Sequence, residues 1–237
     1  MPIKLVTFDL DDTLWDSGLV IRAAEVEMRA WLAINAPLMA DTFDSARQRE
    51  IRERVMAEDP KIIHNLSELR RRVIEGAMLA CGYSNEESLG LSHHAFSVFF
   101  EARQKVVLFE GTLPMLESLQ RNFVLGALSN GNANLERVGL DRFFSFHFSA
   151  ESIGVGKPAP DMFNAAMAWA KALPAESVHV GDHPEHDMLG AARLGIHTIW
   201  FNTRNFDALD EVTPSRIAGS LHDIPQLVES IGGSTLE

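Results

Sequence analysis

One stretch near the N-terminus constrains the fold most: a short apolar segment that ends abruptly in carboxylates. Residues 4–14 read Lys-Leu-Val-Thr-Phe-Asp-Leu-Asp-Asp-Thr-Leu. The β-branched Val6 and Thr7 within an apolar run indicate a buried strand. Asp9 then lies at the carboxyl end of that strand, where open α/β sheets place their ligand crevice.

The three acidic side chains of this stretch, Asp9, Asp11 and Asp12, repel one another unless a cation holds them together. Asp9 can offer its side chain to a hard cation and Asp11 its carbonyl oxygen, which leaves the Asp11 carboxyl free to face a substrate. The alternative is structural: Asp11 or Asp12 caps a helix that begins near Thr13. The stretch alone does not decide between the two.

After Gly111 the chain alternates between strands and helices. Strands are predicted at 123–128, 144–148, 177–180 and 198–201, and helices at 160–171, 188–194 and 221–229, the last with Asp223 as its cap. This alternation is typical of an α/β fold, a doubly wound, Rossmann-like parallel sheet with helices on both faces.

The segment between the first strand and this alternation is helical throughout. Four helices are predicted, at 19–34, 42–58, 66–81 and 86–107, without a convincing strand. We therefore predict a helical domain of residues 16–107, inserted into an α/β core of residues 1–15 and 108–237.

The charge balance narrows the possible ligands. The chain has 21 Lys and Arg against 33 Asp and Glu, a net charge of −12. Such a chain is a poor candidate for binding nucleic acid or an anionic membrane, and an anionic substrate needs a local positive site. We expect a cytoplasmic protein, because the chain has a single cysteine, Cys81, and we find neither a signal peptide nor a run of roughly 20 apolar residues. The sequence does not distinguish a monomer from a homodimer.

Polar residues follow four of the predicted strands, and the carboxyl ends of parallel strands share one edge of a sheet. In chain order they are Asp9, Asp11 and Thr13, then Ser129 and Asn130, then Lys157, then Asp182 and Asp187. Each group alone has an ordinary explanation as a turn residue, a solvated lysine or a helix cap. All four on one edge indicate a site.

This constellation resembles the four motifs of the haloacid dehalogenase superfamily. The matching segments are Asp9-Leu10-Asp11-Asp12-Thr13, Ser129-Asn130, Lys157-Pro158 and Gly181-Asp182 with Asp187. The helical insertion is similar to the first cap type of that family. The resemblance implies an aspartyl-phosphate mechanism, with Asp9 as the nucleophile and Asp11 as the general acid and base.

The resemblance also implies a ligand set. Mg²⁺ would be held by Asp9, by the carbonyl of Asp11 and by Asp182, with Asp187 as a further ligand or a neighbour of the ligands. The phosphoryl oxygens would be bound by Thr13, Ser129 and Lys157, with Asn130 as an added donor.

Two features separate this chain from parts of the superfamily. Dehalogenases of the superfamily use no metal and lack an acid at the position of Asp11, so Asp11 favours a phosphatase. His186 stands before Asp187, where Asn or Asp is more usual. We favour His183 and His186 as solvated loop residues, with contact to the metal or the substrate as the alternative.

The helical insertion is expected to select the substrate. Residues 60–79 are similar to the cap of bacterial flavin-pathway phosphatases, which act on FMN and on 5-amino-6-(5-phospho-D-ribitylamino)uracil. His64, Arg70 and Arg72 fall where that cap also has a His and two Arg. They would contact the distal part of the substrate, although for the arginines we favour a solvated, salt-bridged helix face.

We therefore predict a Mg²⁺-dependent phosphomonoester hydrolase of the flavin pathway. Sugar phosphates or nucleotides are the alternative substrates. A 2-haloacid dehalogenase is less favoured because Asp11 is present, and a non-catalytic relative because Asp9 and Asp11 are both present. A phosphomutase of the same fold is a further, less favoured alternative, which would form a sugar phosphate rather than free phosphate.

Overall fold

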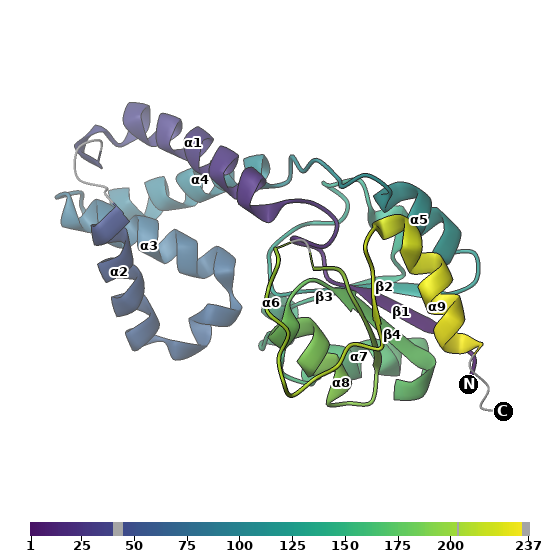
Figure 1. The fold of residues 1–237 in the computed structure, drawn as a ribbon. Coiled ribbons are helices and arrows are strands. Elements are labelled where there is room, and N and C mark those ends of the chain that lie inside the picture. The colour runs from purple at the N-terminus through teal and green to yellow at the C-terminus, as the bar shows by residue number, and fades with distance from the viewer. Residues whose placement is uncertain (40–44, 203, 234–237) are drawn as a thin grey trace. The chain divides into compact units, whose positions relative to one another are not determined.

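The structure is a computed structural model that describes residues 1–39, 45–202 and 204–233 (Figure 1). The chain divides into two compact units, an α/β unit of residues 1–17 and 106–237 and a helical unit of residues 18–105. Within the described residues, no helix is both long enough and apolar enough to cross a membrane.

The α/β unit is built on a six-stranded sheet in the order β3-β2-β1-β4-β5-β6, with every pair of neighbours parallel. The strands are β1 (Leu5–Phe8), β2 (Val124–Ser129), β3 (Phe146–Ser149), β4 (Ser177–Gly181), β5 (His197–Trp200) and β6 (Arg216–Ile217). This confirms the predicted doubly wound parallel sheet; the short edge strand β6 was not predicted.

Helices cover both faces of this sheet: α7 and α8 lie on one face, and α5 and α9 on the other (Figure 1). The helices of the unit are α5 (Thr112–Leu119), α6 (Ala150–Ile153), α7 (Asp161–Ala170), α8 (Gly190–Ala192) and α9 (Ile224–Gly232). β1 is paired on both edges, and all four of its residues are buried. Burial on two faces explains its continuous apolar run, since a half-exposed strand would alternate.

The connections place a ligand crevice at the end of β1. The chain leaves β1 towards β2 on one side, and returns from β3 to β4 on the other side. In doubly wound sheets, the crevice lies at the carboxyl ends of the strands where the winding reverses. Here that point is between β1 and β4.

The helical unit consists of α1 (Ser17–Asn35), α2 (Ser45–Glu58), α3 (Leu66–Ala80) and α4 (Asn85–Arg103). Each helix contributes to one apolar core, through residues such as Met28, Ile51, Met78 and Phe99. The start of the predicted helix at 42–58 lies partly outside the described residues. Within its described residues, 18–39 and 45–105, this unit contains helices and no strand, as its 3.6-residue periodicity indicated.

Some predicted boundaries are wrong. α4 ends at Arg103 rather than at 107, because the chain then pairs with the segment after β1: Leu108 bridges Trp15, and the N–H of Phe109 donates to Leu14. The helix predicted at 188–194 is a π-helical turn, Pro184–Leu189, that continues into α8.

Asp223 occupies the N-cap position of the last helix, as predicted, but its side chain makes no capping hydrogen bond. α9 begins at Ile224, and the Asp223 carboxylate accepts from the N–H of Ser220 at 2.9 Å instead of capping the helix. The Ser220 hydroxyl accepts from the N–H of His222, so Ser220 is the capping residue of the short turn before α9. Composition does not distinguish two cap formers, Ser and Asp, that are three residues apart.

Candidate active site

Three carboxylates meet at the carboxyl ends of β1 and β4. Asp9 follows β1, and its N–H donates to Val180 of β4 at 2.9 Å. Asp182 follows β4, and its carbonyl accepts from the indole N–H of Trp200 at 2.7 Å. Asp9, Asp182 and Asp187 are buried, and one carboxylate oxygen of each lies within 4.8 Å of the others.

Asp187 reaches this cluster from the π-helical turn because Gly181 leaves space for it. A Cβ atom at Gly181 would lie 2.4 Å from Cγ of Asp187, a distance that side chains do not tolerate. The N–H of His183 donates to Oδ2 of Asp187 at 3.0 Å, which fixes the carboxylate from the other side. The glycine before Asp182 is therefore a packing requirement of Asp187.

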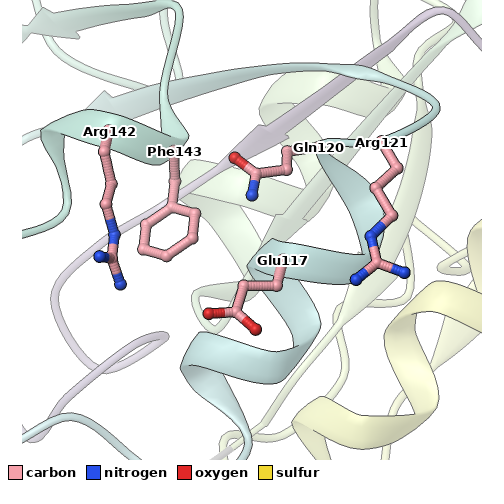
Figure 2. A pocket seen from close by; sticks show the side chains of 5 residues that line it. All are labelled: Glu117, Gln120, Arg121, Arg142 and Phe143. Atoms are coloured by element: carbon pink, nitrogen blue, oxygen red, sulfur yellow. The ribbon is translucent and has the colours of Figure 1, made fainter.

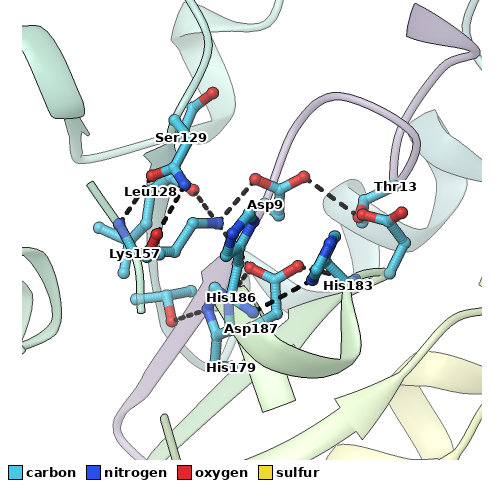
Figure 3. Close-up of polar contacts among 12 residues, drawn as sticks. Asp9, Thr13, Leu128, Ser129, Lys157, His179, His183, His186 and Asp187 are labelled. Atoms are coloured by element: carbon cyan, nitrogen blue, oxygen red, sulfur yellow. Dashed lines mark hydrogen bonds and ion pairs between the residues drawn. The ribbon is translucent and has the colours of Figure 1, made fainter. Parts of the chain in front are cut away.

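Lys157 supplies the positive charge at the centre of the cluster (Figure 3). Its Nζ donates to Oδ1 of Asp9 at 2.7 Å, to Oδ1 of Asp187 at 2.6 Å and to the carbonyl of Leu128 at 2.7 Å. These three bonds use all three N–H donors of an ammonium group. Burial lowers the pKa of Lys157, but Asp187 and Asp9 raise it to about 12, so the group stays charged.

The carboxylates differ in their pKa values. Burial raises the pKa of Asp9 well above its usual range, with Asp187 and Asp182 adding to the effect and Lys157 opposing it. Burial also raises the pKa of Asp182, to about 7, helped by Asp187 and Asp12. For Asp187 burial is outweighed by Lys157 and His179, which hold its pKa below the usual range.

This cluster fits a hard divalent cation. The ammonium of Lys157 pairs with two of the three carboxylates, those of Asp9 and Asp187, so the cluster of these four groups has a net charge of −2 when all three acids are ionised. Oxygen donors grouped in this way suit Mg²⁺ or Ca²⁺. Among the residues that the structure describes, it is the one group of three or more acidic, histidine or cysteine side chains that meets in this way.

Asn130 holds the backbone of Lys157. Its Nδ2 donates to the Lys157 carbonyl at 2.8 Å, and its Oδ1 accepts from the Lys157 N–H at 2.7 Å. A Cβ at Gly156 would lie 2.8 Å from Oδ1 of Asn130, so a side chain there would break this contact. The Ser129 hydroxyl accepts from the N–H of Gly131 at 2.9 Å and shapes the turn after β2.

The two acidic residues after Leu10, Asp11 and Asp12, have separate roles. Asp11 Oδ1 accepts from the indole N–H of Trp15 at 2.8 Å. Asp12 has a left-handed backbone (φ 62°), and its carboxylate accepts from the N–H and hydroxyl of Ser17, the first residue of α1. Asp12 therefore fulfils the capping alternative, for a helix that starts at Ser17 rather than near Thr13.

Thr13 is fully buried next to the carboxylates of Asp9 and Asp182. Its hydroxyl lies 3.4 Å from Oδ2 of Asp9 and 3.5 Å from Oδ1 of Asp182. These contacts orient the carboxylates. A contact between Thr13 and a phosphoryl oxygen stays a prediction, as do the phosphate contacts of Ser129 and Lys157.

The site residues predicted in the α/β unit, except Thr13, line a hollow of about 140 Å³. It is lined by Asp9, Asp11, Asp12, Ser129, Asn130, Gly131, Lys157, Asp182, His183, His186, Asp187 and Arg204. A larger hollow of about 350 Å³ lies elsewhere on the α/β unit, lined by Glu117, Gln120, Arg121, Arg142 and Phe143 (Figure 2). It contains one carboxylate and none of the motif residues, so the smaller hollow is the candidate site.

The two loop histidines line this hollow and are half-buried rather than fully solvated. The rings of His183 and His186 stack with centroids 3.9 Å apart and an interplanar angle of 14°. Nδ1 of His183 accepts from the N–H groups of Glu185 and His186, which caps the π-helical turn. Burial lowers the pKa of His186.

Sequence reasoning missed three residues of this site: His179, Trp200 and Arg204. His179 could have been found, because strand alternation places it on the same face of β4 as Gly181, against which Asp187 packs. Arg204 forms an ion pair with Asp12 and donates to the Ser17 hydroxyl at 3.2 Å. Its loop carries no pattern that predicts this position.

The residues predicted in the helical unit have partners within that unit. Arg70 lies 3.3 Å from Glu25 and over the ring of Phe99, and Arg72 lies 3.3 Å from Glu58. His64 ends a short helical turn and is half-buried. A substrate would compete with these ion pairs, so the contacts of His64, Arg70 and Arg72 with substrate stay a prediction.

Comparisons with known proteins agree with this geometry. A model of the haloacid dehalogenase-like hydrolase family matches residues 3–195. The 5-amino-6-(5-phospho-D-ribitylamino)uracil phosphatase YigB of Escherichia coli (strain K12) is 34% identical over 207 residues, 87% of each chain. A phosphoserine phosphatase of Thermus thermophilus is 29% identical over 65% of this chain and 63% of its own.

Among solved structures, one described as a 2-haloacid dehalogenase from Pseudomonas syringae pv. Tomato DC3000 is 40% identical, with a TM-score of 0.92. The match covers 96% of this chain and 99% of that one. The family match, the relatives and the arrangement of Asp9, Lys157, Asp182 and Asp187 agree: the chain belongs to the haloacid dehalogenase-like hydrolase family.

Proposed function

We propose that this protein is a Mg²⁺-dependent phosphomonoester hydrolase that acts through an aspartyl-phosphate on Asp9. The main support for this proposal is the position of the Asp9 carboxylate, between the ammonium of Lys157 and the carboxylates of Asp182 and Asp187. Asp11 lines the same hollow with its carboxyl group held by Trp15. A nucleophile, a separate acid and a place for a cation therefore occur together.

The residues of the chain divide the reaction into two steps. In the first, a carboxylate oxygen of Asp9 bonds to phosphorus, the bond from phosphorus to the ester oxygen breaks, and Asp11 gives its proton to that oxygen. In the second, Asp11 takes a proton from water as the water oxygen bonds to phosphorus, and free phosphate leaves Asp9. Asp11 returns to its acid form and Asp9 to its carboxylate.

Charge is the obstacle to the first step, because a carboxylate must approach a dianion. When bound, Mg²⁺ on Asp9, Asp182, Asp187 and the Asp11 carbonyl would offset the charge of the transferred group. Lys157 orients Asp9 and favours its ionised form against the opposing effect of burial, and the Thr13 hydroxyl orients the carboxylates of Asp9 and Asp182.

The hollow is large enough for a phosphate group and not for a flavin. At about 140 Å³ it recognises the transferred group, and the rest of the substrate lies outside it. We assign residues 1–15 and 108–237 to the catalytic core and residues 16–107 to a cap that selects the substrate. FMN and 5-amino-6-(5-phospho-D-ribitylamino)uracil are the proposed substrates, supported by residues 60–79 and by the similarity to YigB.

A dehalogenase is the second candidate, because a structure at 40% identity is described as one. Two observations favour the phosphatase. The carboxyl of Asp11 faces the hollow, which gives the acid and base that phosphate ester hydrolysis needs. The acidic cluster is arranged for a cation.

The test is the release of free phosphate and of halide by the same preparation. The phosphate panel contains FMN, the ribitylaminouracil phosphate, sugar phosphates, nucleotides and p-nitrophenyl phosphate, each with Mg²⁺ and with EDTA; the halide assay uses 2-haloacids without metal. We expect Mg²⁺-dependent phosphate release, greatest for the two flavin-pathway compounds and abolished in Asp9→Asn. Halide release without phosphate release would overturn the proposal, whereas a preference for sugar phosphates would overturn only the substrate.

A further inference from the structure

A chain of buried hydrogen bonds connects β1 and β4 to the candidate nucleophile. Thr7 and His179 are direct neighbours in the register of the two strands, and Oγ1 of Thr7 lies 2.8 Å from Nδ1 of His179. Nε2 of the same imidazole lies 3.1 Å from Oδ1 of Asp187. That oxygen also accepts from Lys157, whose ammonium binds Asp9 (Figure 3).

The partners of the imidazole define its protonation pattern. An ionised carboxylate only accepts hydrogen bonds, so Nε2 of His179 must carry a proton to bind Asp187. Nδ1 then holds a lone pair, which the Thr7 hydroxyl satisfies by donating. The other acceptor near that hydroxyl, the Val178 carbonyl, is farther away at 3.3 Å.

The surroundings hold this imidazole in one orientation. His179 is fully buried. The rings of His179 and of Phe163 in α7 pack edge to face, with their centroids 5.1 Å apart and an interplanar angle of 88°. The ring therefore cannot turn without breaking both of its hydrogen bonds.

We propose that His179 is a positioning residue: held by Thr7, its imidazole fixes the carboxylate of Asp187 and, through it, the ammonium of Lys157 on Asp9. This inference rests on the proposed function, in which Asp9 is the nucleophile. His179 touches neither Asp9 nor the hollow, so it acts through Asp187 and Lys157. Loss of such an outer partner of a metal site costs roughly 10- to 100-fold in activity or metal affinity.

The test compares variants that differ in single hydrogen bonds. Thr7→Val removes the hydroxyl at nearly constant volume, and Thr7→Ser retains it. His179→Gln can still present an N–H near the position of Nε2, and His179→Leu cannot. Thr198→Val is the matched control, because the buried Thr198 is the neighbour of His179 on the other adjacent strand, β5, and its hydroxyl accepts from the N–H of Ser215 at 3.1 Å.

Activity is measured with Mg²⁺ on a phosphate ester that the wild-type protein hydrolyses, beside the melting temperature of each variant. We expect kcat to fall roughly 10- to 100-fold in Thr7→Val and His179→Leu, with a much smaller change in KM. Thr7→Ser and His179→Gln should retain most of the wild-type kcat. Thr198→Val should lower the melting temperature without lowering kcat. Equal kcat values for Thr7→Val and Thr198→Val, or for His179→Gln and His179→Leu, would overturn the proposal.

A spectroscopic measurement without metal separates this inference from the proposed function. In protein labelled with ¹⁵N-histidine, the ring nitrogens of His179, identified by their absence in His179→Gln, should show a neutral Nε2–H tautomer. The Nδ1 shift should move in Thr7→Val and stay in Thr198→Val. An Nδ1–H tautomer would refute the role of His179 even if the wild type releases phosphate, and an inactive wild type with the expected spectra would refute only the phosphatase.

Discussion

Asn130 and Lys157 are joined by two reciprocal hydrogen bonds, one from the amide of Asn130 to the Lys157 carbonyl and one from the Lys157 N–H back to the Asn130 side chain. Residues after β2 thereby fix the loop that brings Lys157 to Asp9. The prediction of Asn130 as a donor to phosphate left this contact out. In the structure, the side chain of Asn130 is hydrogen-bonded to the backbone of Lys157.

Asn130→Asp tests this contact. The variant keeps an acceptor for the Lys157 N–H but loses the donor to the carbonyl, and two oxygens then face each other. Because small misplacements of reacting groups cost up to about 10²-fold, we expect kcat to fall roughly 10- to 100-fold. Asn134→Ala, which removes an exposed turn contact to Arg137 in the same loop, should leave kcat unchanged; an equal loss in both variants would contradict the assignment.

Asp11→Asn tests the acid and base. The amide oxygen still accepts from Trp15, so the side chain keeps its place while it loses the transferable proton. We expect kcat to fall roughly 10²- to 10⁴-fold for alkyl phosphates, the usual contribution of a positioned acid or base. Formation of the aspartyl-phosphate should be impaired less for p-nitrophenyl phosphate, whose leaving group needs no proton. A pre-steady-state burst of nitrophenol measures this, and an equal loss for both ester types would argue against Asp11 as the acid.

The pKa of Asp182, raised to about 7, predicts how Mg²⁺ binding depends on pH. Without a cation, the folded chain binds the Asp182 proton more tightly than the unfolded chain does, so raising the pH through this range removes stability. Mg²⁺ competes with that proton. The rise in melting temperature on adding Mg²⁺ should therefore be larger at about pH 8 than at about pH 6.

Asp182→Asn is the control for this measurement. The variant lacks the titrating group and one cation ligand, so the rise should be small and nearly independent of pH. A rise in the wild-type protein that does not change with pH would show that Asp182 does not bind the cation.

Gly181→Ala tests the close approach of Asp187. The added Cβ would lie 2.4 Å from Cγ of Asp187, so the carboxylate must move away from Lys157. Overpacking of this kind costs about 1–3 kcal/mol of unfolding free energy, and we expect most of the activity to be lost with it. Chemical denaturation and phosphate release measure the two effects.

Gly90→Ala is the comparison for that substitution. Gly90 lies inside α4, and an added Cβ there meets no atom within 4 Å. Alanine in a helix interior should stabilise the chain by roughly 0.5–1 kcal/mol and leave the activity unchanged. A similar loss of stability and activity in Gly181→Ala and Gly90→Ala would indicate that Gly181 is needed only for its backbone conformation.

The fold was predictable because its signals are local. The buried run at 5–8 and the alternation after Gly111 specify parallel strands and helices, and the segment of residues 16–107 has helical periodicity. The predictions that failed concern the ends of helices, because these ends depend on contacts between residues that are distant in sequence. α4 stops at Arg103 because the following residues pair with Leu14 and Trp15, and that pairing leaves no trace in local composition.

The sequence by itself determined which chemical groups follow the strands, because the carboxyl ends of parallel strands share one edge of the sheet. That reasoning named Asp9, Asp11, Lys157, Asp182 and Asp187 without coordinates. Tertiary structure alone decided what each group touches, since hydrogen bonds depend on strand register and on ångström distances that residue spacing does not encode. The pairing of β1 with β4 sets Thr7 against His179, and the approach of the π-helical turn to Gly181 sets Asp187 against Lys157.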